Sequence, residues 1–203
     1  MKKVISPIGV PRVPFQQSPE SDVQWIDIYS RLYIERILFI FFVLDENIVN
    51  QLIASLFYLN YADNRKEMNE ISLYINSIGG SLLGGITLYD VMQYIKIDIM
   101  TTCMGVASSV SALILANGKY PKRKILPHSR VLLHQPTLES YGQASDVIIE
   151  SEGLLRFRQL LGKIYIEHTT QTLSRIARDM DRDCFLSSRE ALNYGLVDQI
   201  LIG

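Results

Sequence analysis

Cysteine is scarce in this sequence, which has only Cys103 and Cys184 among its 203 residues. The two lie far apart and neither belongs to a CxxC pair, so the spacing excludes a disulfide framework and the common cysteine-based zinc sites. We therefore expect a protein of a reducing compartment, without a metal site.

A strong charge bias is also missing, because 20 lysines and arginines face 21 aspartates and glutamates and leave a formal net charge of −1. There is no basic excess that would attract nucleic acid and no acidic tail. The longest apolar run, residues 37–44, is far shorter than the roughly 20 residues that a membrane-spanning helix requires. We expect neither a nucleic-acid partner nor a membrane partner.

Continuous apolar character is absent from the first residues as well. Three prolines and a glycine interrupt residues 1–15, whereas a signal peptide requires an unbroken apolar segment. We interpret residues 1–24 as an extended, flexible N-terminal arm.

The rest of the chain alternates between strand-like and helix-like apolar spacing. Such alternation predicts an α/β fold with mostly parallel strands, and the length is that of one domain. We expect helices over 25–35, 46–58, 83–95 and 110–116, strands over 37–43, 70–76, 99–104, 123–126 and 130–133, and a loop over 62–69.

A much longer helix is predicted over 143–168. About 26 residues at about 1.5 Å each extend roughly 39 Å, about the width of the domain, so part of this helix must project. It also carries more apolar side chains than a solvated helix tolerates, Leu155 and Leu161 among them. Two interpretations stay open, a core helix and a contact between subunits.

Two strand-to-helix turns, at 76–80 and 105–109, are rich in glycine and other small residues. Unpaired N–H groups at a helix start can hold an oxyanion, a phosphate or a nucleophile. Neither turn continues into GKS/T or GxGxxG, so a nucleotide site is disfavoured.

Catalysis by a serine nucleophile requires a histidine that accepts the serine proton and a carboxylate that orients the histidine. His134 follows an apolar strand and is the best candidate, although a hydrogen-bonded core histidine is the simpler alternative. His168 ends the long helix, where a capping role is expected. His128 has no evident task.

Three serines border the helix at 110–116, and any of them could be an N-cap or a packing residue. They are Ser108, Ser109 and Ser111. Three carboxylates present the same problem, because a charged cluster is usually a solvated face or a face between subunits. They are Asp179, Asp181 and Asp183.

Several segments, taken in order, resemble the proteolytic subunits of the Clp protease family over almost the whole chain. They are YINSIGG at 74–80, CMGVASS at 103–109, LPHSR at 126–130, LHQP at 133–136, RDCFLS at 182–187 and EALNYGLVD at 190–198. Several blocks in order are far more specific than any one motif. The segments PIGVP at 7–11 and WIDIY at 25–29 are similar to the cyanobacterial and plastid branch.

The resemblance implies that Ser109 is the nucleophile, His134 the general base and Asp183 the orienting carboxylate. It also implies an oxyanion hole made by the backbone N–H groups of Gly80 and Val110. A side chain at Gly80 is then expected to obstruct the approaching carbonyl group.

The same resemblance implies a crotonase-like fold of repeated β-β-α units. Within one domain it predicts a head core over 25–142, a projecting handle helix over 143–168 and a C-terminal head segment over 169–203. Handle helices would join two stacked seven-membered rings, of this subunit or of paralogous subunits, into a barrel that degrades unfolded proteins.

A Clp AAA+ ATPase chaperone would feed that barrel and use the ATP, so this chain itself would need no cofactor. The resemblance implies a hydrophobic docking pocket for the ATPase that includes Tyr74, Tyr94 and Leu201. It implies the plastid stroma as the location, with the cyanobacterial cytoplasm as the alternative.

One departure from the family is Ile78, which stands where a proline is usual, so this turn loses a φ constraint. Two other functions have to be weighed. A structural subunit of low activity in a mixed ring is disfavoured by the presence of all three triad residue types. An acyl-CoA enzyme on the same fold is disfavoured by the triad and by the apolar handle.

Overall fold

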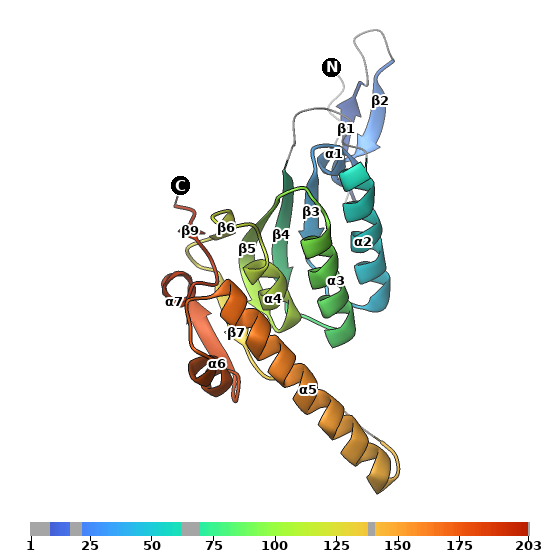
Figure 1. Cartoon of the computed structure of the whole chain (residues 1–203). Coiled ribbons are helices and arrows are strands. Elements are labelled where there is room, and N and C mark those ends of the chain that lie inside the picture. Colours follow the sequence, from blue (N-terminus) through green and yellow to red (C-terminus); the bar gives the residue numbers. More distant parts are fainter. Residues whose placement is uncertain (1–8, 17–21, 62–69, 138–140, 203) are drawn as a thin grey trace.

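The computed structural model describes residues 9–16, 22–61, 70–137 and 141–202, so the expected loop at 62–69 and much of the expected arm lie outside the described residues. A seven-stranded sheet forms the centre of the molecule (Figure 1). Its strands are β3 (Ile37–Ile40), β4 (Ile71–Ser77), β5 (Ile99–Ser108), β6 (Arg123–Ile125), β7 (Arg130–Leu133), β8 (Cys184–Ser187) and β9 (Gln199–Ile200).

The sheet is mostly parallel, as the alternating pattern predicts. Strands follow the order β3-β4-β5-β6-β9, and β7 and β8 branch from β5. The first part of β5 pairs with β6 and its last part with β7. Among the strands of this sheet that the structure describes, β8 alone runs antiparallel, against β7. Because β4, β5 and β7 are parallel, the residues that follow them emerge at the same edge of the sheet.

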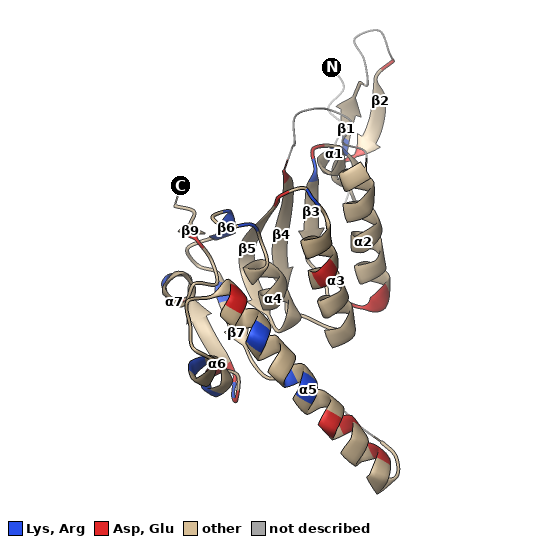
Figure 2. Ribbon diagram, viewed as in Figure 1, with Lys and Arg blue, Asp and Glu red and all other residues tan. Residues whose placement is uncertain are grey.

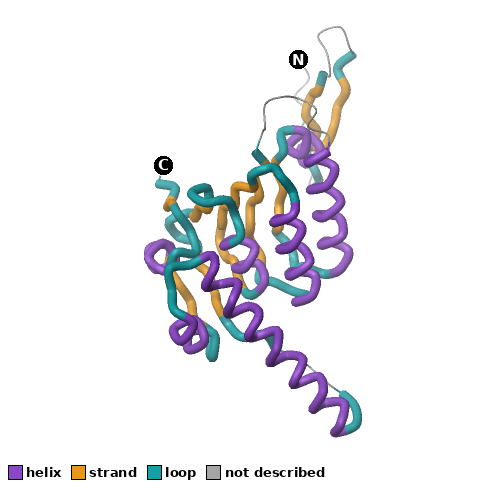
Figure 3. The backbone as a smooth tube through the Cα atoms, viewed as in Figure 1, coloured by secondary structure: helices purple, strands orange, loops and turns teal. Residues whose placement is uncertain are grey.

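Helices α2, α3 and α4 lie side by side over one face of the sheet (Figures 1 and 3). Every residue of α4 is buried, which makes it the central helix of the core. No helix among the described residues combines the length and the apolar character needed to cross a membrane. The helices are α1 (Ile28–Ile34), α2 (Glu46–Tyr61), α3 (Leu82–Tyr94), α4 (Val110–Ala116), α5 (Ala144–His168), α6 (Leu173–Asp179) and α7 (Ser188–Tyr194).

The N-terminal region differs from its prediction. Strand β1 (Arg12–Phe15) pairs antiparallel with β2 (Gln24–Asp27), so the described part of the expected arm includes a strand. The helix expected over 25–35 is wrong in its first residues, since α1 begins only after Asp27, whose side chain accepts the Ser30 N–H at 2.8 Å. Trp25 therefore belongs to a strand and is 53% exposed.

Helix α5 leaves the body of the molecule, with lysine, arginine, aspartate and glutamate all present along it (Figure 2). Its buried residues are confined to the C-terminal end, between Leu161 and Tyr165. Ile148, Ile149 and Leu155 are 61%, 67% and 56% exposed. The interpretation as a core helix is therefore wrong for most of its length.

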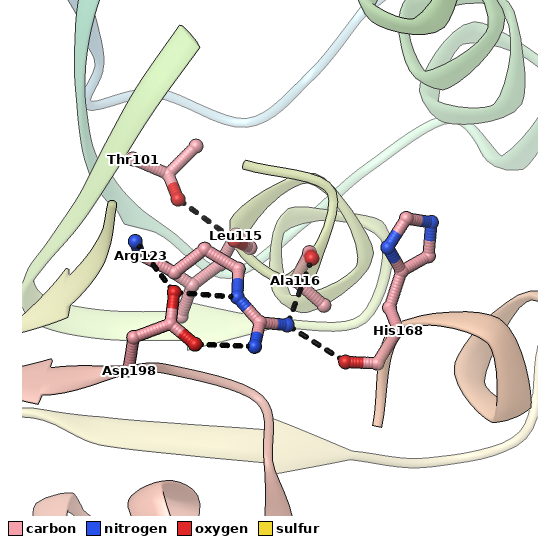
Figure 4. A network of polar contacts seen from close by, with 6 residues as sticks. All are labelled: Thr101, Leu115, Ala116, Arg123, His168 and Asp198. Atoms are coloured by element: carbon pink, nitrogen blue, oxygen red, sulfur yellow. Dashed lines mark hydrogen bonds and ion pairs between the residues drawn. The ribbon is translucent and has the colours of Figure 1, made fainter. Parts of the chain in front are cut away.

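The base of α5, by which we mean its C-terminal residues 161–168, is held by a buried ion pair (Figure 4). Arg123 donates to Asp198 at 2.6 Å, and both side chains are only 7% exposed. The same guanidinium donates to the carbonyl oxygens of His168 at 2.7 Å and Ala116 at 3.2 Å. One side chain thus joins the ends of α4 and α5 to the segment before β9.

Candidate active site

Ser109 stands between β5 and α4 in a strained conformation. Its φ of 57° and ψ of −130° are unusual for a residue with a Cβ, and strain of this kind concentrates at functional sites. It is the N-cap residue of α4, yet its side chain makes no capping hydrogen bond. The neighbouring candidates Ser108 and Ser111 are 4% and 0% exposed, so Ser109 is the serine that solvent and substrate can reach.

Ser109 borders a pocket of about 270 Å³. The pocket is formed where the turns before α3 and α4 meet the segment after β7 and the C-terminal part of α5. Its lining comprises Gly80, Ser81, Leu82, Ser109, Val110, His134, Pro136, Thr137, Leu161 and Tyr165.

His134 enters this pocket because it directly follows β7. Leu133 pairs with Cys184 in the antiparallel β7–β8 ladder, so the next residues outward, His134 and Asp183, lie opposite each other. The distance from His134 Nδ1 to Asp183 Oδ1 is 3.6 Å. Within the described residues the buried Nε2 of His134 has no hydrogen-bond partner, which leaves this nitrogen free to meet a serine proton.

The other carboxylates have different partners. Asp179 accepts the Tyr194 hydroxyl at 3.0 Å, and Asp181 pairs with Arg158. The loop that carries Asp183 is held in turn by Gln135, whose backbone N–H donates to the Met180 carbonyl at 2.7 Å. Geometry therefore separates Asp183 from its neighbours, which sequence patterns could not do.

The two other histidines lie elsewhere. His128 is exposed in the turn before β7. His168 Nε2 lies 3.0 Å from the Tyr89 hydroxyl, so its side chain joins α5 to α3 instead of only capping the helix. Burial, followed by the charge of Arg123, lowers the pKa of His168.

The two expected oxyanion donors, Gly80 and Val110, both line the pocket. Val110 is the first residue of α4, and the N–H groups of a first helical turn have no partner inside the helix. Such paired donors suit the oxygen of a tetrahedral intermediate.

The expectation that a side chain at position 80 would obstruct the substrate carbonyl is wrong, because the protein's own backbone occupies that space. A Cβ there would lie 2.3 Å from the Leu44 carbonyl oxygen, so it would strike the protein's own backbone and not an approaching substrate. The glycine that faces the nucleophile is Gly79, where a Cβ would lie 2.7 Å from the Ser109 Cβ. The GG pair in the sequence could have indicated both close approaches.

Sequence patterns also missed Leu161 and Tyr165, which bring the base of α5 to the pocket. Tyr165 is 3% exposed, and its burial raises the pKa of its hydroxyl. Their i, i+4 spacing predicts that they share one face of the long helix. That this face lines the pocket follows only from how the helix packs on the rest of the molecule.

The expected docking residues lie on different elements. Tyr74 of β4 stacks on Phe39, with ring centroids 5.8 Å apart, and Tyr94 contacts Phe57 with centroids 6.2 Å apart. Leu201 follows β9 and is 37% exposed. Their role in docking stays a prediction. In the described parts of the chain, no group of His, Cys, Asp and Glu side chains is arranged to hold a metal ion.

A partly exposed serine at a strained helix start lines one pocket with a histidine, and a carboxylate lies opposite that histidine. This arrangement fits the class of serine hydrolases with a Ser-His-Asp triad. Comparison of the sequence with known proteins identifies one family within this class. The family model described as Clp protease matches residues 19–202, and the chain belongs to the Clp protease family.

Curated relatives cover nearly the whole chain. One from Bigelowiella natans, named ATP-dependent Clp protease proteolytic subunit, is 58% identical over 96% of this chain and 98% of its own length. Relatives of the same name come from Chlorella vulgaris, with 52% identity over 97% of this chain and 96% of the relative, and from Marchantia polymorpha, with 48% identity over 97% and 96%. The resemblance to the family is thereby confirmed.

Proposed function

We propose that this chain is a serine endopeptidase, the proteolytic subunit of an ATP-dependent Clp protease. The observation that carries the proposal is the convergence of Ser109, His134, Gly80 and Val110 on one pocket, with Asp183 opposite the histidine. The whole-length similarity to chains named as such subunits supports it.

In the proposed reaction the Ser109 Oγ attacks the carbonyl carbon of a peptide bond, and its proton passes to His134 Nε2. The N–H groups of Gly80 and Val110 hold the oxygen that becomes negative. His134 then gives the proton to the leaving amine, and an acyl-enzyme on Ser109 remains. Water attacks this ester with His134 again as base, which releases the acid and restores the serine.

Asp183 orients His134 through Nδ1. At 3.6 Å the two groups are close to hydrogen-bond distance, and catalytic hydrogen bonds are often longer before substrate is bound. Asp183 is also exposed, so a neighbouring subunit that covers this surface would strengthen the interaction by excluding water.

The exposed apolar face of α5 supports assembly into a barrel of two stacked seven-membered rings, with α5 as the contact between the rings. Substrates would be unfolded proteins delivered by a Clp AAA+ ATPase. That partner would bind ATP and would dock near Tyr74, Tyr94 and Leu201, while this chain would need no cofactor. The relatives come from algae and plants, which supports the plastid as the proposed location.

The test is a set of triad variants studied in the assembled complex. A fluorophosphonate probe should label Ser109 in the wild type and fail to label Ser109→Ala. Ser109→Ala, His134→Ala and Asp183→Asn should each suppress cleavage of a short fluorogenic peptide, and Ser109→Ala with His134→Ala should cost little more than either alone, because groups that act together are not additive.

Native mass spectrometry must show the same assembly for each variant. Ser108→Ala is the matched control, since its serine is buried beside the nucleophile. If Ser108→Ala abolishes cleavage while Ser109→Ala retains it in an intact complex, the assignment of the nucleophile is wrong. A wild-type complex that neither reacts with the probe nor cleaves peptides contradicts the proposed activity itself.

A further inference from the structure

Ser77 is a buried polar residue beside the candidate oxyanion turn, and the proposed mechanism does not use it. Its side chain is only 3% exposed, at the end of β4. The hydroxyl donates to the Phe42 carbonyl oxygen at 2.6 Å and accepts the Gly79 N–H at 3.1 Å. It therefore connects the segment after β3 with the turn that carries one expected oxyanion donor.

The peptide group between Gly79 and Gly80 is held by the same segment after β3, through Leu44. The carbonyl oxygen of Gly79 accepts the Leu44 N–H at 2.8 Å, and the Leu44 carbonyl oxygen accepts the Ser81 N–H at 2.7 Å. These two hydrogen bonds form the isolated bridge between Leu44 and Gly80, and neither of them uses the N–H of Gly80.

The direction of the Gly80 N–H follows from peptide geometry. In a planar trans peptide the C=O of one residue and the N–H of the next point in opposite directions. Since the Gly79 C=O points at Leu44, the Gly80 N–H points away from that segment, and Gly80 lines the pocket that contains Ser109. Both polar groups of Gly79 are thus held, one by Ser77 and the other by Leu44.

This support matters more here because Ile78 occupies the position between Ser77 and Gly79. Isoleucine does not fix φ as proline does, and its side chain is 66% exposed, so little packing restrains it. Gly79 and Gly80, with φ values of 98° and 155°, follow directly. Without a fixed neighbour, such a glycine pair has many accessible conformations.

We propose that Ser77 is a positioning residue, whose hydroxyl orients the Gly80 N–H toward the developing oxyanion. The proposal rests on the proposed peptidase function and assigns to Ser77 a role in turnover. Ser77 touches neither substrate nor nucleophile in this role; it acts through the Gly79 peptide group. Donors that stabilise a transition state are effective only when they are oriented before the reaction.

The test compares Ser77→Ala with Ser188→Ala in the assembled complex. Ser188 is a matched control, because it is 6% exposed and its hydroxyl donates to the Pro127 carbonyl at 2.8 Å, at a different place in the fold. Ser77→Ala should lower kcat for a short fluorogenic peptide by about 10- to 100-fold while KM changes little. Inhibition by a peptide boronate, which forms a tetrahedral adduct with serine, should weaken by a similar factor.

Ser77→Cys provides a second variant if Ser77→Ala does not assemble. Its thiol is larger than the hydroxyl and forms weaker hydrogen bonds, but it keeps a donor and an acceptor at this position, so kcat should fall between wild type and Ser77→Ala. Unchanged kcat in both variants, a loss through KM alone, or an equal loss in Ser188→Ala overturns the positioning role. An active wild type with unaffected Ser77 variants contradicts this inference only, whereas a wild type inert to both the peptide and the fluorophosphonate probe overturns the proposed function and this inference together.

Discussion

At the scale of single residues, Gly79 is under two constraints at once. Its φ of 98° disfavours any side chain, and a Cβ would lie 2.7 Å from the Ser109 Cβ and 2.9 Å from the Ser108 carbonyl oxygen. Neither contact can relax by rotating a flexible side chain. The turn before α3 and the turn before α4 can therefore pack together only with glycine at this position.

We predict that Gly79→Ala lowers the free energy of unfolding by about 1–3 kcal/mol and removes most peptidase activity. The reason is that the new methyl group must displace Ser109. Gly162→Ala is the control, because it lies outside the part of α5 that is proposed to join the rings and a Cβ there would meet the Leu173 Cδ1 at 3.4 Å, an ordinary contact. Alanine should stabilise a helix by up to about 1 kcal/mol there. Denaturant unfolding and peptide hydrolysis measure both effects, and a Gly79→Ala protein with normal activity would contradict this account of the turn.

The residue types of the candidate site could be read from the sequence, but the choice among them could not. Ser108, Ser109 and Ser111 all border one helix, and only their burial separates them. Asp183 differs from Asp179 because the ladder of β7 and β8 brings it opposite His134. Such pairings join residues some fifty positions apart, and no local pattern encodes them.

At the scale of elements, the sequence predictions are accurate where local interactions determine an element, and less accurate where pairing with a distant segment does. The helix expected over 143–168 is observed as Ala144–His168, because local apolar spacing determines it. Strand β5, expected over 99–104, continues to Ser108 because β7 pairs with its last residues. Residues 25–27, which the sequence predicts as the start of a helix, belong to β2 instead, because β2 pairs with β1 from a different segment of the chain.

The contact between α5 and α3 has a predictable pH dependence. Burial, and then the charge of Arg123, lower the pKa of His168 below its ordinary value of 6.5, whereas Glu167 acts in the opposite direction. The unfolded state therefore takes up the proton first as the pH falls through about 6.5, and the free energy of unfolding decreases until the pH reaches the lowered pKa of the folded state. Above about pH 6.5 the stabilisation is fully present.

We expect His168→Gln to reduce this dependence, because glutamine can still bond to the Tyr89 hydroxyl but does not titrate. The measurement is the free energy of unfolding of wild type and variant at about pH 7.5 and about pH 5.5. The wild type should lose more stability on acidification than the variant. Equal losses would show that His168 has the same pKa in the folded and unfolded states.

At the scale of the whole molecule, the exposed apolar side chains of α5 require a partner surface. Ile149 and Leu155 are 67% and 56% exposed, whereas Leu161 is 6% exposed and belongs to the pocket. Substitutions that test assembly should therefore avoid Leu161, because they would damage the candidate active site as well.

We predict that Ile149→Lys combined with Leu155→Lys separates the stacked rings into single rings or smaller species, because charges buried in an apolar contact are strongly unfavourable. Sedimentation velocity or native mass spectrometry measures the change. Tyr120→Lys is the control, since Tyr120 is 74% exposed in the segment after α4, away from the free part of the helix. If the doubly substituted protein still forms the full barrel, α5 does not join the rings.

Peptidase activity of the separated species gives a further expectation. The residues of the pocket come from one chain, yet its lining includes Leu161 and Tyr165 at the base of α5. If contacts between the rings restrain α5, the variant should lose peptidase activity. The measurement is the rate of short-peptide cleavage by isolated single rings compared with the rate of the barrel. Full activity of single rings would contradict it.

The buried pair of Arg123 and Asp198 has a mechanical consequence for α5. The exposed part of the helix, residues 144–160, is a lever roughly 25 Å long. A rotation of about 10° at its base would move its tip by roughly 4 Å, whereas apolar contacts tolerate gaps of only about 1 Å. Stacking of the proposed rings thus demands an angular precision of about 2° at the base of each helix. The hydrogen bond from Arg123 to the His168 carbonyl lies at the C-terminal end of α5, about which the helix would rotate. Loss of this bond would therefore displace the N-terminal end of the helix, where the rings are proposed to meet.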